Sequence, residues 1–369
     1  MRSIEHSPRY ESLDTAVLSV AQTYGFTGSP LSLTRNDLAG APADADRDTA
    51  LIACLVGKIG KVTQTTQAWA TAKKGGGTTV VYAAASPKLA IAQAFVVKAA
   101  LSTVEAAGFD APSISMTSVG DQESRRRYMR ELGNFFKKNA KDLPDALVAE
   151  SAKDPDGAAR ALIDAEHPLA ESLPRTIDYL SESSRKIMLE TIALFESLGI
   201  GYELDARLPY VPEVQRELVF AVFGTDRKGN RVRVASGGRY QDEAKGVKKK
   251  DQTDIVGMSV VLDDQLDVRR GSEAAPSCFV VHIGEAAKMR AFTLLDSLWR
   301  AQIALHQALL LDTIAEQMEH AKSSGAKYIA VIGQREALDG TVILKNTATQ
   351  LQETVPAERF VSRMSRVRV

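Results

Sequence analysis

The sequence lacks the features that mark metal binding, secretion or a membrane span. Its two cysteines, Cys54 and Cys278, lie far apart without metal-ligand spacing, so we expect both to be reduced core residues. The five histidines are equally scattered. No apolar run approaches the ~18 residues of a spanning helix, and the charged N-terminus does not resemble a secretory signal. We therefore expect a cytoplasmic protein with no membrane association, metal or cofactor.

The sequence also lacks a charge bias and the common catalytic motifs. Acidic and basic residues number 46 each, so a nucleic acid would have to be bound by a local patch. There is no Ser-His-Asp or Cys-His set, no P-loop and no Rossmann fingerprint. A chain of 369 residues fits two or three domains.

Hydrophobic patterns that are present predict a mixed α/β protein. A helix is expected over 13–24, and the Lys73–Gly77 cluster is expected to be a hairpin turn or flexible loop. Helical spacing dominates 121–198, and a small polar linker covers 272–277. Beyond it, alternating strands and helices predict a small α/β domain with a mixed or parallel sheet. The other predicted elements are strands at 80–84, 113–119, 219–223, 232–235, 256–262, 278–283, 328–332 and 341–344, and helices at 90–107, 288–301 and 312–324.

Several motifs in collinear order resemble the histidyl-tRNA synthetase family over nearly the whole chain. The resemblance implies a class II synthetase-like antiparallel core at 1–120 and 187–271, a helical insertion at 121–186, and an anticodon-binding-like α/β domain at 276–369. It also implies a homodimer. The matching pieces are Tyr24-Gly25-Phe26 followed by Pro30, Ser115–Asp121, Asp178-Tyr179-Leu180, Leu198-Gly199-Ile200, Arg207-Leu208, Gly237–Tyr240 and Tyr328–Leu344.

The positions that the family uses for chemistry are altered. Class II enzymes hold the ATP phosphates with arginines, because charge developing at the α-phosphate needs fixed cations. The family's RGLDYY corresponds to Tyr210–Gln215, so Tyr210 replaces the arginine, while Val214 and Gln215 replace the tyrosines. In motif 3, Asp264 stands at the arginine position and Val261 at a glycine position. The motif 2 region between Lys58 and Tyr82 contains no arginine. We therefore predict no catalytic residues.

A small-molecule pocket could still form from the remaining positions of these strands. Gly237 and Gly238 could instead form a tight β-bend that packs under a helix, and Arg239 could bind an anion or pair with a carboxylate such as Asp205 or Glu213. The candidate pocket residues are Tyr210, Glu213, Gln215, Gly237, Gly238, Arg239, Tyr240 and Gln241.

RNA-binding candidates lie in the C-terminal domain, because phosphate contacts need lysine or arginine. They are Lys322, Lys327, Arg335 and Lys345. The runs Arg125–Arg127 and Lys248–Lys250 are mainly expected to be solvated. The alternating Arg363, Arg366 and Arg368 could form a basic tail or an edge strand.

These observations favour a catalytically inactive histidyl-tRNA synthetase-like protein that binds tRNA or a protein partner. Two alternatives remain open. One is an active histidine–tRNA ligase with a divergent ATP site. The other is a regulatory subunit of ATP phosphoribosyltransferase in histidine biosynthesis, although that group typically lacks the C-terminal domain.

Overall fold

The fold is known from a computed structural model that describes most of the chain. The described residues are 17, 20, 21, 23–28, 52, 65–72, 78–85, 89–109, 112–211, 214–226, 228–241, 254–262, 277–301 and 303–367. Within these ranges no helix is both long and apolar enough to cross a membrane. The expected Lys248–Lys250 loop, the 272–277 linker apart from Ser277, Cys54, Arg368 and residues 58–64 and 73–77 of the motif 2 region lie outside them.

The larger sheet has eight strands in the order β1-β2-β3-β8-β7-β6-β4-β5. All neighbours are antiparallel except β1 with β2 and β4 with β5. Each of the five strands predicted between residues 80 and 262 falls in this sheet, so that part of the prediction is confirmed. The strands are β1 (Thr27–Gly28), β2 (Thr65–Ala72), β3 (Thr78–Ala85), β4 (Ser113–Gly120), β5 (Tyr202–Leu204), β6 (Gln215–Thr225), β7 (Arg231–Gln241) and β8 (Asp254–Leu262).

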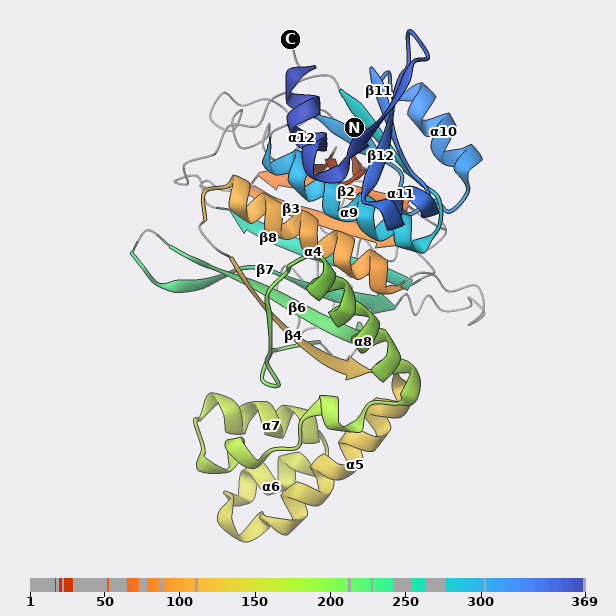
Figure 1. Ribbon diagram of the computed structural model, residues 1–369. Helices are drawn as coiled ribbons and strands as arrows, with labels where there is room; N and C mark the ends of the chain where they lie inside the picture. Colours follow the sequence, from red (N-terminus) through yellow and green to blue (C-terminus); the bar gives the residue numbers. More distant parts are fainter. Residues whose placement is uncertain are drawn as a thin grey trace.

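Local sequence explains the hairpin and the helices that cover this sheet. Strands β2 and β3 pair directly across the glycine-rich residues 73–77, which confirms a hairpin there. The Ala-rich helix α4 (Leu89–Ala106) lies on one face of the sheet, beside α8 (Glu182–Ser197), as Figure 1 shows. Gly108, at φ 95°, follows α4 and adopts a left-handed backbone that favours glycine, so the helix stops there as predicted.

The segment between β4 and α8 folds into a separate helical lobe, seen at the bottom of Figure 1. Its longest helix, α5, buries Tyr128, Leu132 and Phe136 at four-residue intervals, which is the spacing of one helical face. These side chains form a core of their own with Leu143, Ala158 and Leu162. The lobe comprises α5 (Gln122–Lys138), η1 (Ala140–Asp142), α6 (Asp145–Ser151), α7 (Pro155–Asp164), η2 (Pro168–Ser172) and η3 (Thr176–Tyr179).

The C-terminal part is a five-stranded mixed sheet flanked by helices, as the alternating pattern predicts. Its strand order is β10-β9-β11-β12-β13, with the first three parallel and the last two antiparallel. Arg363 and Arg366 lie in a helix, so the edge-strand alternative was wrong; Phe360 and Met364 bury one face of that helix. The elements are β9 (Cys278–His282), α9 (Glu285–Arg300), β10 (Leu305–Gln307), α10 (Ile314–Ser323), β11 (Tyr328–Ile332), α11 (Gln334–Asp339), β12 (Thr341–Asn346), β13 (Gln352–Pro356) and α12 (Ala357–Arg366).

The C-terminal part packs directly on the larger sheet's covering helix α4. The rings of Phe95 on α4 and Phe292 on α9 meet edge to face at 4.6 Å between centroids. Beside them, Lys98 Nζ lies 2.8 Å from Asp296 Oδ1, and the Lys98 side chain is only 6% exposed. Core residues of both parts belong to one continuous hydrophobic cluster. The two parts are therefore joined through a buried interface.

Candidate functional site

The paired glycines of β7 allow three strands to approach one another closely. A Cβ added to Gly237 would lie 2.0 Å from the carbonyl oxygen of Gly257, and one added to Gly238 would lie 2.6 Å from that of Leu218. Both glycines sit within a continuous strand rather than in a bend. Backbone packing is thus sufficient to explain this glycine pair.

Alternation along β7 divides the predicted pocket residues between the two faces of the sheet. Gly237 and Arg239 pair with Met258 and Val256, which belong to the hydrophobic cluster beneath α4. Gly238 and Tyr240 point the other way. We call this side the distal face: the side of the sheet opposite α4, formed here by Ser236, Gly238 and Tyr240 of β7 and by Gly257 and Ser259 of β8.

Arg239 forms an ion pair on the α4 side of the sheet. Its Nη1 atom lies 3.0 Å from Glu217 Oε1, and the two side chains are 15% and 3% exposed. Glu217 has a left-handed backbone (φ 55°) at a β-bulge and pairs with Gly120, which is also left-handed. The carboxylate alternative for Arg239 is therefore confirmed, with Glu217 as a partner that the sequence did not indicate.

Tyr210 reaches from the loop before β6 to the helical lobe. Its hydroxyl donates to both carboxylate oxygens of Asp156 on α7, at 3.1 and 3.2 Å. Burial raises the pKa of Asp156, and the nearby Arg125 guanidinium and the Tyr210 hydroxyl oppose that rise. Burial, and then the Asp156 charge, raise the pKa of Tyr210 well above its usual value. At neutral pH the hydroxyl is therefore a proton-bearing donor.

Gln215 connects the same loop to the distal face. Its Oε1 accepts from the Val211 amide at 2.7 Å, and its Nε2 donates to the Tyr240 hydroxyl at 3.2 Å. Gln215 is 3% exposed and Tyr240 is fully buried. Of the predicted pocket residues, Gln215 and Tyr240 are thus in direct contact, and Tyr210 precedes Val211, the residue whose amide Gln215 binds.

The remaining predicted pocket positions are less informative. Val214 lies in the turn before β6 and is half-buried. Gln241 is the last residue of β7, and Val261 lies on β8. Glu213 and Asp264 lie outside the described residues.

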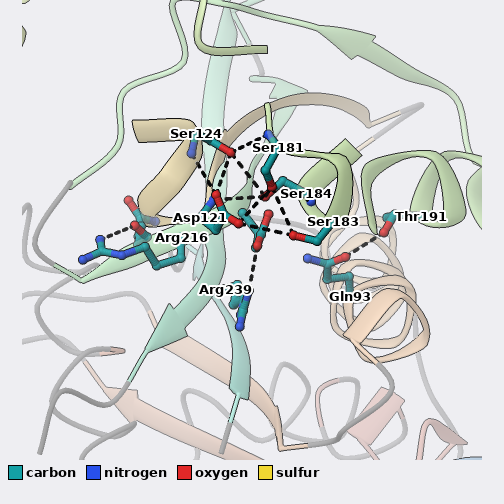
Figure 2. Close-up of polar contacts among 11 residues, drawn as sticks. Gln93, Asp121, Ser124, Ser181, Ser183, Ser184, Thr191, Arg216 and Arg239 are labelled. Carbon is teal, nitrogen blue, oxygen red and sulfur yellow. Dashed lines mark hydrogen bonds and ion pairs between the residues drawn. The ribbon is translucent and has the colours of Figure 1, made fainter. Parts of the chain in front are cut away.

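A polar cluster at the base of the helical lobe was not found from the sequence. Figure 2 shows Ser124, Ser181, Ser183 and Ser184 gathered around Asp121, at the starts of α5 and α8; we call these five residues the hinge cluster. Asp121 Oδ1 accepts from the Ser124 amide and hydroxyl, each at 2.8 Å. Its Oδ2 accepts from Ser181 at 2.9 Å and Ser183 at 3.2 Å. The Asp-Xaa-Xaa-Ser spacing ahead of α5 is a helix-start signal that could have pointed to Asp121.

Three of the four RNA-binding candidates lie close together. Lys345 pairs with Ile329, so alternation puts it on the same side of the sheet as Lys327. Lys322 is on the last turn of α10, which packs on that side. We call Lys322, Lys327 and Lys345 the lysine cluster. Arg335 follows the other end of the five-residue β11, about 16 Å along the strand, and pairs with Asp339.

Metal-binding and thiol chemistry find no support in the described part of the chain. No group of three or more potential metal-ligating side chains occurs there. Cys278 is buried, as expected, and burial raises the pKa of its thiol to about 12. The thiol therefore stays protonated and unreactive at neutral pH.

Comparisons with known proteins give a consistent assignment. The anticodon binding domain model matches residues 277–366. The histidine–tRNA ligases of Symbiobacterium thermophilum and Thermosynechococcus vestitus are 26% and 28% identical over 278 and 288 residues, covering 73% of this chain. The match spans 64% of each of these relatives, which is less than two thirds of their length.

A solved structure shares the fold. The apo histidyl-tRNA synthetase of S. aureus superimposes with a TM-score of 0.54 at 19% identity, covering 98% of this chain and 96% of that one. The antiparallel core, the helical lobe and the C-terminal α/β part agree with the architecture that the sequence motifs imply. These similarities support a member of the histidyl-tRNA synthetase family with a C-terminal anticodon binding domain.

Proposed function

We propose that this protein has lost histidine activation and acts as a tRNA-binding or regulatory module, working as a homodimer in the cytoplasm. The observation that carries the proposal is the hydrogen bond between Tyr210 and Asp156. In the family resemblance, the position of Tyr210 belongs to a catalytic arginine. In this protein the position holds the neutral Tyr210 hydroxyl, which is hydrogen-bonded to the Asp156 carboxylate of the helical lobe.

The electrostatics of the distal face support the loss of ATP chemistry. Amino-acid activation needs fixed positive charge around the α-phosphate. In the middle of β7 and β8 the positions on this face are neutral: Ser236, Gly238, Tyr240, Gly257 and Ser259. The arginines of β7 on this side, Arg231 and Arg233, lie at the start of the strand beside Phe223. Val261 adds bulk where the family has glycine. Such a surface offers a triphosphate little compensation for losing its hydration.

The C-terminal part supports RNA binding instead. It matches an anticodon binding domain, and the lysine cluster provides three cations at one end of β11. Lysines at such a surface bind RNA phosphates and displace the counterions condensed on the RNA. The affinity for RNA therefore decreases as the salt concentration rises. The named activity of the relatives makes tRNA the natural RNA to test.

An active histidine–tRNA ligase is the second candidate. The relatives named as histidine–tRNA ligases favour it, since they match 73% of the chain. It requires an ATP site with a phosphate-binding arrangement different from that of the family motifs.

Binding of uncharged tRNA, measured at low and moderate salt with ATP and histidine titrated in parallel, tests the proposal. We expect micromolar or tighter tRNA binding that weakens steeply with salt, and no ATP binding. A lysine-cluster variant, Lys327→Ala with Lys345→Ala, should reduce both the affinity and the salt dependence. Saturable binding of ATP and histidine would favour the ligase, and absent tRNA binding would contradict the RNA-binding role.

A further inference from the structure

Two sets of hydrogen bonds, joined by the backbone between Tyr210 and Val211, connect the helical lobe to the middle of the larger sheet. The Tyr210 hydroxyl donates to Asp156 on α7. The amide of the next residue, Val211, donates to Gln215, which in turn donates to the Tyr240 hydroxyl on β7. We call these five residues the relay. We propose that Tyr210 is a positioning residue and that the relay couples the placement of the helical lobe to the state of the distal face.

Three of the hydrogen-bonding side chains of the relay are buried, so the loss of a hydrogen-bond partner is costly for each of them. Asp156, Gln215 and Tyr240 are 5%, 3% and 0% exposed. A buried polar group that loses its hydrogen-bond partner cannot bond to water instead, which destabilises the folded state. A displacement of one residue of the relay therefore favours a displacement of the residue bonded to it. Without the Tyr210 hydroxyl, the Asp156 carboxylate would rely on Arg125 Nη2, which is 3.8 Å away.

Among the described residues of this loop, Tyr210 and Arg207 both form polar contacts with the lobe, and the contact of Tyr210 is the more buried. Arg207 also pairs with Glu171 of η2, but their side chains are 50% and 78% exposed. An exposed pair of this kind contributes little to holding two parts together. The hinge cluster fixes the lobe where the chain leaves the sheet, and the relay fixes it again at α7.

The two ends of the relay can therefore influence each other. A ligand on the distal face that displaced the Gln215 side chain from Tyr240 would also disturb its bond to the Val211 amide, and with it the neighbouring Tyr210. By linkage, a partner that moved α7 would alter the distal face to the same extent. This coupling does not require RNA, because all the contacts of the relay lie within the protein itself.

Hydrogen exchange followed by mass spectrometry tests the coupling. Tyr210→Phe removes the hydroxyl, and Gln215→Met removes the central amide without touching α7. We expect amide exchange in α7 (Pro155–Asp164) to accelerate about tenfold in both variants. Asp156→Ala removes the acceptor at the lobe end of the relay and should give the same pattern.

A matched control separates coupling from general destabilisation. Thr191→Val breaks the buried 2.7 Å bond between Thr191 and Gln93 on α8 and α4, away from the relay. It should lower the melting temperature while leaving exchange in α7 unchanged. The proposal is overturned if Gln215→Met leaves α7 protected as in the parent, or if Thr191→Val exposes α7 equally. Neither result bears on tRNA or ATP binding, so this inference and the proposed function can fail separately.

Discussion

The Asp121 carboxylate accepts a hydrogen bond from the Ser181 hydroxyl at 2.9 Å, although 60 positions separate the two residues in the sequence. Asp121 is the N-cap of α5 and Ser181 is the N-cap of α8. One carboxylate thus lies between the positive ends of two helices and fixes where the helical lobe leaves the sheet.

Replacing Asp121 by alanine should therefore destabilise the protein by about 1 kcal/mol, the typical cost of losing a helix cap. Chemical denaturation measures the loss. Asp154→Ala, which removes the N-cap of α7 alone, is the matched control. If Asp121 acts at both helices, its variant should lose more stability than this control; an equal or smaller loss would argue against the double role.

The stabilisation from Asp121 should also depend on pH. Burial opposes its ionisation, but hydrogen bonds from Ser124, Ser181 and Ser183 outweigh this and lower its pKa in the folded state. A carboxyl group with a depressed pKa stabilises the fold above its unfolded pKa of about 3.9, and the effect fades as the pH falls through the lower folded value. The stability difference between the parent and Asp121→Asn should be constant from pH 7 to about pH 5 and shrink below pH 4. A difference independent of pH would refute this assignment.

Gly237 should tolerate no side chain. A Cβ there would lie 2.0 Å from the Gly257 carbonyl oxygen and 2.6 Å from Met258 Cα, both backbone atoms. We expect Gly237→Ala to cost about 3 kcal/mol or to prevent folding. Gly133 on α5 has open space around its would-be Cβ, so Gly133→Ala should stabilise the protein by about 0.5–1 kcal/mol. Thermal unfolding of both variants checks the contrast in sign.

The interface between α4 and α9 should contribute strongly to stability. Phe292 is 2% exposed and packs against Phe95, so Phe292→Ala should cost about 3–5 kcal/mol. Asp296→Ala leaves the buried Lys98 without its 2.8 Å partner and should cost about 2 kcal/mol or more. Asp339→Ala, which breaks an exposed pair with Arg335, should change stability by no more than about 0.5 kcal/mol. Equal losses for the two aspartates would show that the interface adds no special stability.

The position of the lysine cluster leads to a graded prediction for tRNA binding. Lys327→Ala should weaken binding and reduce the slope of log affinity against log salt by about one unit per contact. Arg335→Ala should have a smaller effect, because Arg335 lies beyond the other end of β11 and pairs with Asp339. A larger effect from Arg335 would move the RNA-binding surface to that end of the sheet.

The fold could largely be predicted because its signals are local. Strand alternation, the Ala-rich run of α4 and the helical spacing around Tyr128 and Leu132 each depend on residues within one element. The C-terminal helix was missed as a definite element, because the alternation of arginine and valine over 366–369 fits a strand as well as a helix. Tertiary packing of Phe360 and Met364 decides for the helix.

The site was harder to predict because its contacts join distant segments. The sequence motifs pointed to Tyr210 and Gln215 as altered positions, but nothing near them indicated Asp156 on α7. Likewise, the sequence left Arg239 either to bind an anion or to pair with a carboxylate such as Asp205 or Glu213, and only the bulge at Glu217 shows the partner. Partners of this kind depend on strand register and loop paths, which a single sequence does not determine.

ATP–pyrophosphate exchange dependent on histidine tests the central claim most directly. The account predicts no exchange above the background of a protein-free reaction, because a neutral tyrosine bound to Asp156 stands where the family resemblance places a catalytic arginine. Histidine-dependent exchange by the purified protein would contradict the account and establish an active ligase.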